Sequence, residues 1–262
     1  MTGAAPAPPP AVRTLIVTDL DGTVLPPTQG APDWTGQRDA LRALSRRLVA
    51  LPGVAPAVVT GRRARNARAL VGVPIWVVGS HGAETLAPHA EDAVPHPIPP
   101  KEHDRVRALA HALAEPGLCP AGMKVEDKGV MLALHHPGVR GTAASERLES
   151  VTTLARDHGL RTVRGRGWTE YRAASCPDKG EALLGLVRRC RPRRLLVAGD
   201  DIGDLAMFEV ARVLWERGQI EECVRVAVRG PEGALRAYEA DCEFVADDPA
   251  DCRERILRYG LS

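Results

Sequence analysis

The chain has 262 residues, of which 44% are hydrophobic and 26% charged, and its formal net charge is +2. This composition is typical of a folded globular protein, and the small net charge favours neither nucleic acid nor an anionic membrane as a partner. No apolar run is long enough to cross a bilayer, and residues 1–10 lack the features of a signal peptide. Six cysteines without a Cys-x-x-Cys pair favour a reducing cytoplasm over a zinc site.

The first predicted element is a buried strand over 13–17, which follows a proline-rich tail, 1–11, that we expect to be disordered. Asp19 and Asp21 come directly after this strand, and side chains two residues apart in a strand lie on the same side. Two neighbouring carboxylates are costly unless a cation or a reaction uses them. The alternative, an acidic loop that caps a helix, needs only one carboxylate. Gly22 then allows the chain to turn.

A helix is predicted over 35–50 and a second buried strand over 55–59, which ends in Thr60-Gly61-Arg62. A hydroxyl at the end of a parallel strand can hold an oxyanion, although threonine is an equally good helix N-cap. Several arginines follow, as is usual for a solvated helix face. We place only Arg62, the one nearest the strand, in the candidate site.

A third strand is predicted over 75–78, and the proline-rich stretch 87–100 is expected to be a linker. The next stretch alternates helix–strand–strand–helix–strand–strand, which indicates a separate α+β unit inserted in an α/β chain. Its predicted elements are 102–113, 123–126, 130–135, 142–157, 160–163 and 168–172.

The α/β pattern resumes at Lys179 with a helix through 187 and a strand over 194–198. A second acidic cluster follows this strand and contains Asp200, Asp201 and Asp204. Because the carboxyl ends of parallel strands meet at one edge of a sheet, we expect this cluster to converge with the first pair of aspartates. An all-oxygen ligand set selects Mg²⁺ over zinc. The last predicted elements are a strand over 223–228, a helix over 232–238, a strand over 243–245 and a helix from 249.

The segment 19–23, Asp-Leu-Asp-Gly-Thr, resembles the first signature of the haloacid dehalogenase superfamily of phosphatases. Thr60, Lys179 and Asp200 match its later motifs, in order. Only four of the 35 basic residues are lysines, so a lysine at 179 stands against the general preference for arginine. The resemblance implies an α/β, Rossmann-like core with a parallel sheet over 12–98 and 176–262. It also implies an inserted α+β cap of type C2 over 99–175.

The resemblance also implies roles for the matched residues. Asp19 would attack phosphorus and form an aspartyl-phosphate, while Asp21 would act as general acid and then general base. Thr60 and Lys179 would hold the transferring oxygens. The expected Mg²⁺ ligands are carboxylates and one backbone carbonyl, from Asp19, Asp21, Asp200, Asp201 and Asp204.

Within the superfamily, three further segments resemble the trehalose-phosphate phosphatases. The loop containing His81 and Gly82 is similar to a Gly-His-Gly-x-Glu segment, and we expect it to line the site. Glu126 and Lys128 look like the Glu-x-Lys pair that holds the disaccharide, although a solvated hairpin turn is the alternative. Glu170 stands where that family carries a second sugar-binding glutamate.

Two departures from the family pattern concern the substrate. His136-Pro137 replaces an aromatic residue and an arginine, and Gly203 and Leu205 flank the last aspartate in place of threonine and glutamate. The four core motifs and the segments at 81–84 and 126–128 lead us to expect a cytoplasmic, monomeric, Mg²⁺-dependent phosphatase acting on trehalose 6-phosphate. The departures motivate two alternatives: the same chemistry on a related sugar phosphate or trehalose-like pseudo-disaccharide phosphate, and a non-catalytic sugar-phosphate sensor.

Overall fold

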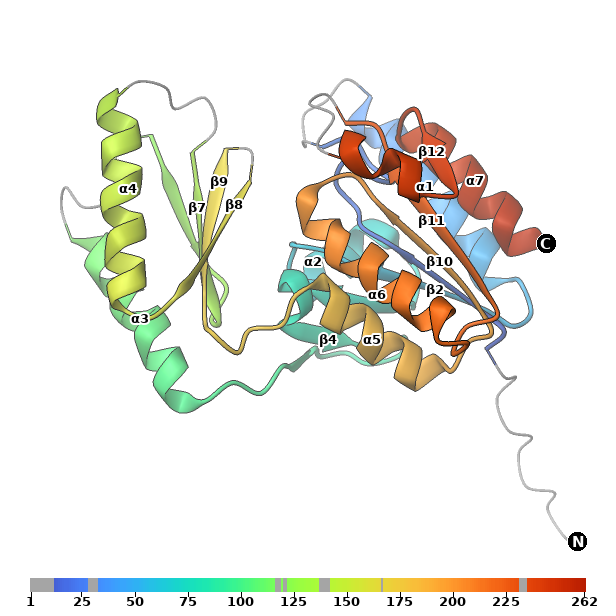
Figure 1. Ribbon diagram of the computed structural model, residues 1–262, viewed down its shortest axis with the longest axis horizontal. Helices are drawn as coiled ribbons and strands as arrows, with labels where there is room; N and C mark the ends of the chain where they lie inside the picture. The colour runs from blue at the N-terminus through green and yellow to red at the C-terminus, as the bar shows by residue number, and fades with distance from the viewer. Residues whose placement is uncertain are drawn as a thin grey trace, which may run out of the picture. The chain divides into compact units, whose positions relative to one another are not determined.

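The computed structural model describes residues 12–27, 33–115, 119, 122–136, 142–165, 167–230 and 235–262. The expected disordered tail, 1–11, lies outside them. The chain divides into two compact units, which we call the core unit (Met1–Pro95 with Pro177–Ser262) and the cap unit (His96–Cys176). The cap unit is thus one continuous insertion in the core unit (Figure 1).

Within the described residues, the core unit is built on an eight-stranded sheet in the order β12-β11-β10-β1-β2-β3-β4-β5. All five residues of the central strand are buried, as expected for a β-branched, apolar strand with helices on both sides. The parallel part comprises β1 (Thr14–Thr18), β2 (Val54–Val59), β3 (Trp76–Gly79), β10 (Arg194–Gly199), β11 (Glu222–Val228) and β12 (Phe244–Ala246). The predicted α/β class with a parallel sheet is confirmed.

Helices cover both faces of this sheet (Figure 1). Side chains alternate along β1, so Ile16 packs on one face, while Leu15 and Val17 pack on the other. The face of Ile16 is covered by α1 (Trp34–Val49), α2 (Ala64–Val71) and α7 (Pro249–Leu261). The opposite face is covered by α5 (Lys179–Cys190) and α6 (Leu205–Glu216). This double layer fixes the strand ends from which the candidate site is built.

The stretch predicted as a linker, 87–100, contains regular structure that the sequence analysis missed. The short strand β5 (Val94–Pro95) lies within this stretch, and it pairs with β4 (Glu84–Leu86) just before it, so that the two antiparallel strands extend the sheet beyond β3. Proline lacks an N–H, but β5 is the edge strand, where no further ladder bond is needed. The linker prediction was therefore wrong for Val94–Pro95.

Two other elements differ from the prediction. The helix α6 was not predicted, and it fills the apolar layer beside α5. The helix expected over 232–238 is instead a 3₁₀ helix, η3 (Arg236–Asp241), and 231–234 lie outside the described residues. The backbone is already extended at Cys242, so only a short segment remains for helical turns before β12.

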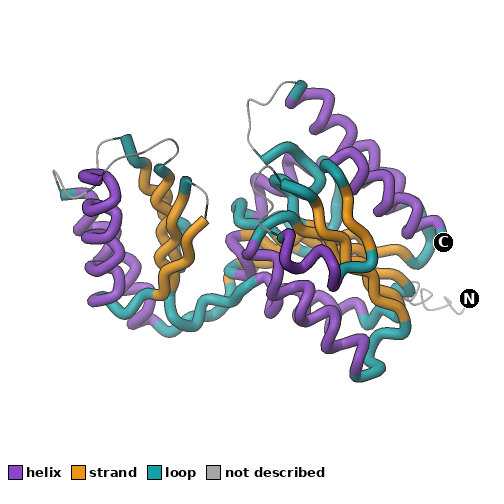
Figure 2. Tube along the Cα trace, turned by 45° about the horizontal axis from the view of Figure 1, so that its top comes forward, coloured by secondary structure: helices purple, strands orange, loops and turns teal. Residues whose placement is uncertain are grey.

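In the part of the cap unit that the structure describes, four strands form an antiparallel sheet in the order β6-β7-β9-β8. Its elements are α3 (Pro100–Ala114), β6 (Lys124–Asp127), β7 (Met131–His135), α4 (Thr142–Asp157), β8 (Arg161–Gly165) and β9 (Trp168–Arg172). Both helices lie along one side of these strands (Figure 2). The hydroxyls of Tyr171 and of Thr152 on α4 are 3.2 Å apart, so Tyr171 faces the helices.

None of the helices among the described residues is long and apolar enough to span a membrane.

Candidate active site

The site is built where β1 and β10 end side by side. The backbone N–H of Asp19 donates to the carbonyl of Ala198 at 3.1 Å, which continues the β1–β10 pairing beyond β1. Gly22 has a φ of 88°, and a Cβ placed there would lie 2.0 Å from Oδ2 of Asp200. Only glycine allows the loop after β1 to approach the loop after β10 this closely. The two acidic motifs therefore meet, as their positions at strand ends predicted.

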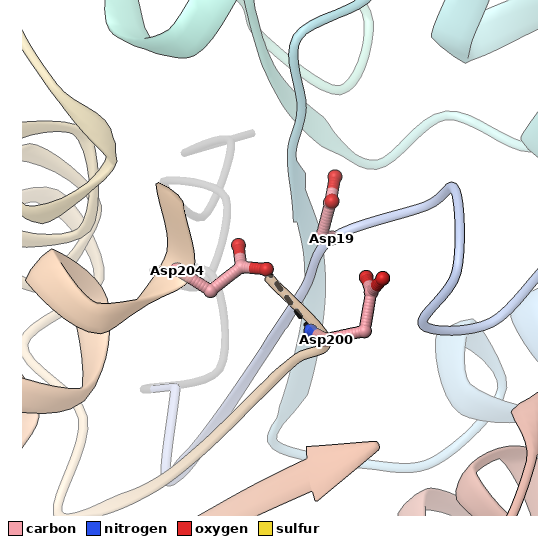
Figure 3. A group of neighbouring side chains, drawn as sticks. All are labelled: Asp19, Asp200 and Asp204. Atoms are coloured by element: carbon pink, nitrogen blue, oxygen red, sulfur yellow. Dashed lines mark hydrogen bonds between the residues drawn. The ribbon is translucent and has the colours of Figure 1, made fainter. Parts of the chain in front are cut away.

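Asp19, Asp200 and Asp204 form a group in which one carboxylate oxygen from each lies within 4.8 Å of the others. Asp204 is fully buried, and its Oδ2 accepts from the backbone N–H of Asp200 at 3.0 Å (Figure 3). The same oxygen accepts from the backbone N–H of Asp201 at 3.2 Å. Asp200 in turn accepts from the hydroxyl of Thr23 at 2.7 Å. These bonds fix the loop after β10 in one conformation.

Lys179, the first residue of α5, balances part of this negative charge. Its Nζ lies 2.9 Å from Oδ2 of Asp19 and 2.7 Å from Oδ1 of Asp204. The lysine side chain is only 3% exposed, so its burial needs both partners. Asp178 and Glu181 form a capping box at the start of this helix, which fixes the backbone at Lys179.

Burial has the largest effect on the pKa values of Asp19 and Asp200. It raises the pKa of Asp19 to about 7, against the lowering effect of Lys179 and with a further increase from Asp204. It raises the pKa of Asp200 to about 8, with the charges of Asp19 and Asp204 acting in the same direction. Burial alone would lower the pKa of Lys179, but the adjacent Asp19 and Asp204 raise it. The lysine is therefore charged, and the acidic group takes a second cation readily.

The donor set fits a magnesium ion. Every candidate ligand atom in the group is a carboxylate oxygen, which is the donor type that Mg²⁺ prefers. In addition, Oδ1 of Asp19 is buried and, among the described residues, has no hydrogen-bond partner. Because a buried carboxylate oxygen without a partner is costly, a bound cation is the natural complement. Asp19, Asp200 and Asp204 are therefore the side chains that could hold Mg²⁺, and their roles as ligands stay predictions.

Binding of Mg²⁺ is expected to weaken as the pH falls from about 8 to about 6, because the ion must then displace protons from Asp200 and Asp19. The association constant should fall by up to about tenfold per pH unit for each displaced proton. Titration calorimetry in buffers of different ionisation enthalpy measures both the affinity and the protons released. An affinity that does not change with pH would contradict the predicted ligands.

Asp21 and Asp201 lie outside this three-carboxylate group. Both oxygens of Asp21 accept from Arg62, at 2.5 Å from Nε and 2.6 Å from Nη2. Such a two-bond fork fixes the direction of a carboxylate. Oδ1 of Asp201 accepts from the N–H of Gly203 at 2.6 Å and caps a short 3₁₀ helix, η2 (Ile202–Asp204). Their expected roles at the metal stay predictions.

Thr60 is 1% exposed at the end of β2, and its Oγ1 accepts from the N–H of Arg62 at 3.2 Å. It is not the N-cap of α2, because Arg63 occupies that position. Glu84 instead accepts from the N–H of Ala64 at 2.8 Å, so a residue from another strand caps the helix. The hydroxyl of Thr60 is thus placed at the strand end, where the superfamily resemblance implies an oxyanion contact.

His81 and Gly82 form a buried turn that supports the Thr60 loop. Ser80 and His81 have φ values of 49° and 57°, a left-handed conformation that is uncommon for residues other than glycine. The N–H of His81 donates to the carbonyl of Thr60 at 2.9 Å, and its ring lies where a side chain at Gly61 would stand. Gly82 packs next to Asp178, just before Lys179. The turn therefore lies between the Thr60 loop and the start of α5.

In the cap unit, the three predicted sugar-binding residues fall into two contacts. Glu126 pairs with His135 at 3.0 Å, and both side chains are exposed by about two fifths. Lys128 and Glu170 are paired at 3.0 Å and are nearly buried. Glu170 also accepts two bonds from Arg172, which the sequence analysis missed. The signal for Arg172 was its position two residues after Glu170, which places both on one face of a strand.

The residues that depart from the family pattern have local partners. Nε2 of His136 lies 3.1 Å from the hydroxyl of Thr169, and Pro137 lies outside the described residues. Gly203 supplies the N–H that Asp201 accepts, and Leu205 begins α6 and packs in its apolar layer. With Gly203 and Leu205 in place, Lys179 contacts both Asp19 and Asp204.

The fold and the acidic group together define a haloacid dehalogenase-like protein with an inserted cap unit. The C-terminal domain of trehalose-6-phosphate phosphatase from C. albicans superposes with a TM-score of 0.72 at 19% identity, covering 96% of this chain and 93% of that one. A haloacid dehalogenase-like hydrolase from Bacteroides thetaiotaomicron superposes with a TM-score of 0.65 at 15% identity, covering 94% and 99%. At these identities the likeness establishes the fold.

Residues 17–239 match the family model for trehalose-phosphatase, and the chain belongs to this family. It is 30% identical to a trehalose-phosphate phosphatase of Mycolicibacterium paratuberculosis over 90% of this chain and 59% of that one. It is also 31% identical to a bifunctional trehalose-6-phosphate synthase/phosphatase of Thermoproteus tenax, over 77% of this chain and 28% of that protein. An uncharacterized glycosyl hydrolase of Mycobacterium tuberculosis is 30% identical over 93% of this chain, which spans 19% of its length.

Proposed function

We propose that this protein is a Mg²⁺-dependent phosphatase that hydrolyses trehalose 6-phosphate to trehalose and phosphate. The observation that carries the proposal is the contact of Asp19 with Lys179 beside Asp200, in a chain that matches the trehalose-phosphatase family over 17–239. The family membership favours trehalose 6-phosphate as substrate, and the acidic group favours the metal dependence.

In the proposed mechanism, an oxygen of Asp19 attacks phosphorus, and the bond from phosphorus to the sugar oxygen breaks. Asp21, held in direction by Arg62, gives a proton to the leaving sugar oxygen. The same carboxylate then takes a proton from the water that hydrolyses the aspartyl-phosphate. Thr60 and Lys179 would contact the transferring oxygens. Bound Mg²⁺ would offset the negative charges of the Asp19 carboxylate and the phosphate group.

In the cap unit, Glu126, Lys128 and Glu170 are proposed as the sugar-binding side chains. Carboxylates and an ammonium suit a sugar because its hydroxyls both donate and accept hydrogen bonds. The pairing of Lys128 with Glu170 supports a preformed arrangement on one face of the cap sheet.

The test is phosphate release from trehalose 6-phosphate, glucose 6-phosphate, sucrose 6-phosphate and p-nitrophenyl phosphate, each with Mg²⁺ and with EDTA. We expect Mg²⁺-dependent turnover with the highest kcat/KM on trehalose 6-phosphate. Turnover of the generic ester alone would retain the phosphatase chemistry and reject the substrate. Absence of any Mg²⁺-dependent turnover would favour a sugar-phosphate sensor.

A second candidate is the same chemistry on a related sugar phosphate or a trehalose-like pseudo-disaccharide phosphate. His136 favours it, because it stands where the family resemblance implies an aromatic residue before an arginine, and it contacts Thr169 in the cap. A higher kcat/KM on another sugar phosphate in the same panel would select this candidate.

A further inference from the structure

The face of the cap sheet that lies away from α4 carries a buried ionic triad. Because Tyr171 faces α4, the alternation of side chains along β9 places Glu170 and Arg172 on the face away from that helix. Arg172 donates to Oε2 of Glu170 from Nε at 2.9 Å and from Nη2 at 2.6 Å. Lys128 donates to the other oxygen, Oε1, at 3.0 Å. Both oxygens of one carboxylate are thus engaged by two different cations.

The burial of this triad distinguishes it from the ion pairs on the surface of the chain. The side chains of Lys128, Glu170 and Arg172 are 6%, 3% and 7% exposed. By contrast, the pair between Arg164 of β8 and Glu149 of α4 is more than half exposed on both sides. Ion pairs on the surface contribute little to the stability of the fold, whereas the loss of one partner of a buried ion pair is strongly destabilising.

The arrangement constrains what Glu170 can do. Its two oxygens already accept three hydrogen bonds, one from Lys128 and two from Arg172. A carboxylate held in this way fixes the ammonium of Lys128, in addition to its proposed contact with the sugar. Arg172 fixes the carboxylate in turn, because two N–H groups of its planar guanidinium, Nε and Nη2, converge on Oε2 of Glu170, and the backbone of β9 carries both residues.

We propose that Arg172 is a specificity-determining positioning residue, which orients Glu170 and through it Lys128 for binding of the sugar. This inference rests on the proposed function of the chain as a sugar-phosphate phosphatase. Arg172 acts on the affinity for the sugar and has no part in the phosphoryl transfer. A lysine at this position keeps the positive charge but loses the planar guanidinium, so Arg172→Lys separates the effect of the fork from the effect of the charge.

The experiment compares Arg172→Lys with the matched control Arg164→Lys, which changes an exposed arginine in the neighbouring strand β8. Steady-state kinetics are measured on the sugar-phosphate panel and on p-nitrophenyl phosphate, which has no sugar. We expect Arg172→Lys to raise KM for the preferred sugar phosphate by about tenfold or more, with kcat and the turnover of p-nitrophenyl phosphate within about twofold. The control should stay within about twofold on every substrate. Trehalose binding, followed by calorimetry, should weaken in parallel with the change in KM.

Two results would overturn the inference. An unchanged KM for the preferred sugar phosphate shows that the fork does not matter. A parallel loss on p-nitrophenyl phosphate, with a lower melting temperature, shows a purely structural role. If the panel shows that the preferred sugar is not trehalose, the proposed substrate fails while Arg172 is still judged on the preferred one. If the protein hydrolyses p-nitrophenyl phosphate but no sugar phosphate and does not bind trehalose, both the substrate and the role of Arg172 are rejected.

Discussion

Replacing Asp19 with asparagine is expected to lower kcat by about 10⁴-fold or more, because an amide cannot replace the carboxylate as nucleophile. The fold should survive the change. Asp19 is buried and its pKa is raised to about 7, so the ionised Asp19 side chain lowers the stability of the fold near neutral pH. Asp204 still pairs with Lys179 at 2.7 Å in the variant. Mg²⁺-dependent phosphate release and a thermal melt in EDTA measure the two effects.

The control for this variant is Asp39→Asn, since Asp39 lies on the exposed side of α1 and has a 60% exposed side chain. It should leave kcat and the melting temperature unchanged. Turnover by Asp19→Asn within about tenfold of the parent would reject Asp19 as the nucleophile. A melting temperature well below that of the parent in EDTA would instead show that the charge of Asp19 supports the fold.

Replacing Lys179 with methionine is expected to lower the free energy of unfolding by about 3–5 kcal/mol, because it leaves Asp19 and Asp204 buried without their cation. Phosphatase activity should be lost as well. The loss of stability should be largest near pH 8 and shrink as the pH falls below about 7, where Asp19 binds a proton and no longer needs a counter-charge. Urea unfolding in EDTA at several pH values measures the dependence.

Lys101→Met serves as the matched control, because Lys101 is an exposed lysine at the start of α3. Its unfolding curve should coincide with that of the parent at each pH. An unchanged urea midpoint for Lys179→Met at pH 8 would contradict the picture of a lysine that neutralises the acidic group. A loss of stability that is the same at every pH would point to packing of the side chain as its cause.

The sequence predicted the part of the site that depends on strand ends. Asp19 and Asp200 were expected to converge because both follow parallel strands, and the structure places their carboxylates in one group. The family resemblance placed Lys179 in the site, where it was expected to hold the transferring oxygens, and the structure places its Nζ 2.9 Å from Oδ2 of Asp19. Such residues can be found from sequence because short, regular elements fix where a strand ends and a helix begins.

Contacts made by long side chains could not be predicted from the sequence. The fork from Arg62 to Asp21 and the one from Arg172 to Glu170 depend on rotamers that only the packed structure selects. Glu84 belongs to a recognisable motif, yet its role as the cap of α2 depends on the pairing of β3 with β4. The edge strand Val94–Pro95 was missed because its proline masks a strand pattern.

The buried turn at His81 has a consequence for how this family can change during evolution. A Cβ at Gly61 would stand 2.6 Å from Nε2 of His81, so an alanine at 61 would force the imidazole to move. Positions 61 and 81 are therefore coupled, because a side chain at 61 would occupy the same space as the imidazole ring at 81. Loss of the ring would open that space, while the backbone N–H at position 81 could still donate to the carbonyl of Thr60. We therefore expect a side chain at position 61 to be tolerated better together with a small residue at position 81 than beside the histidine.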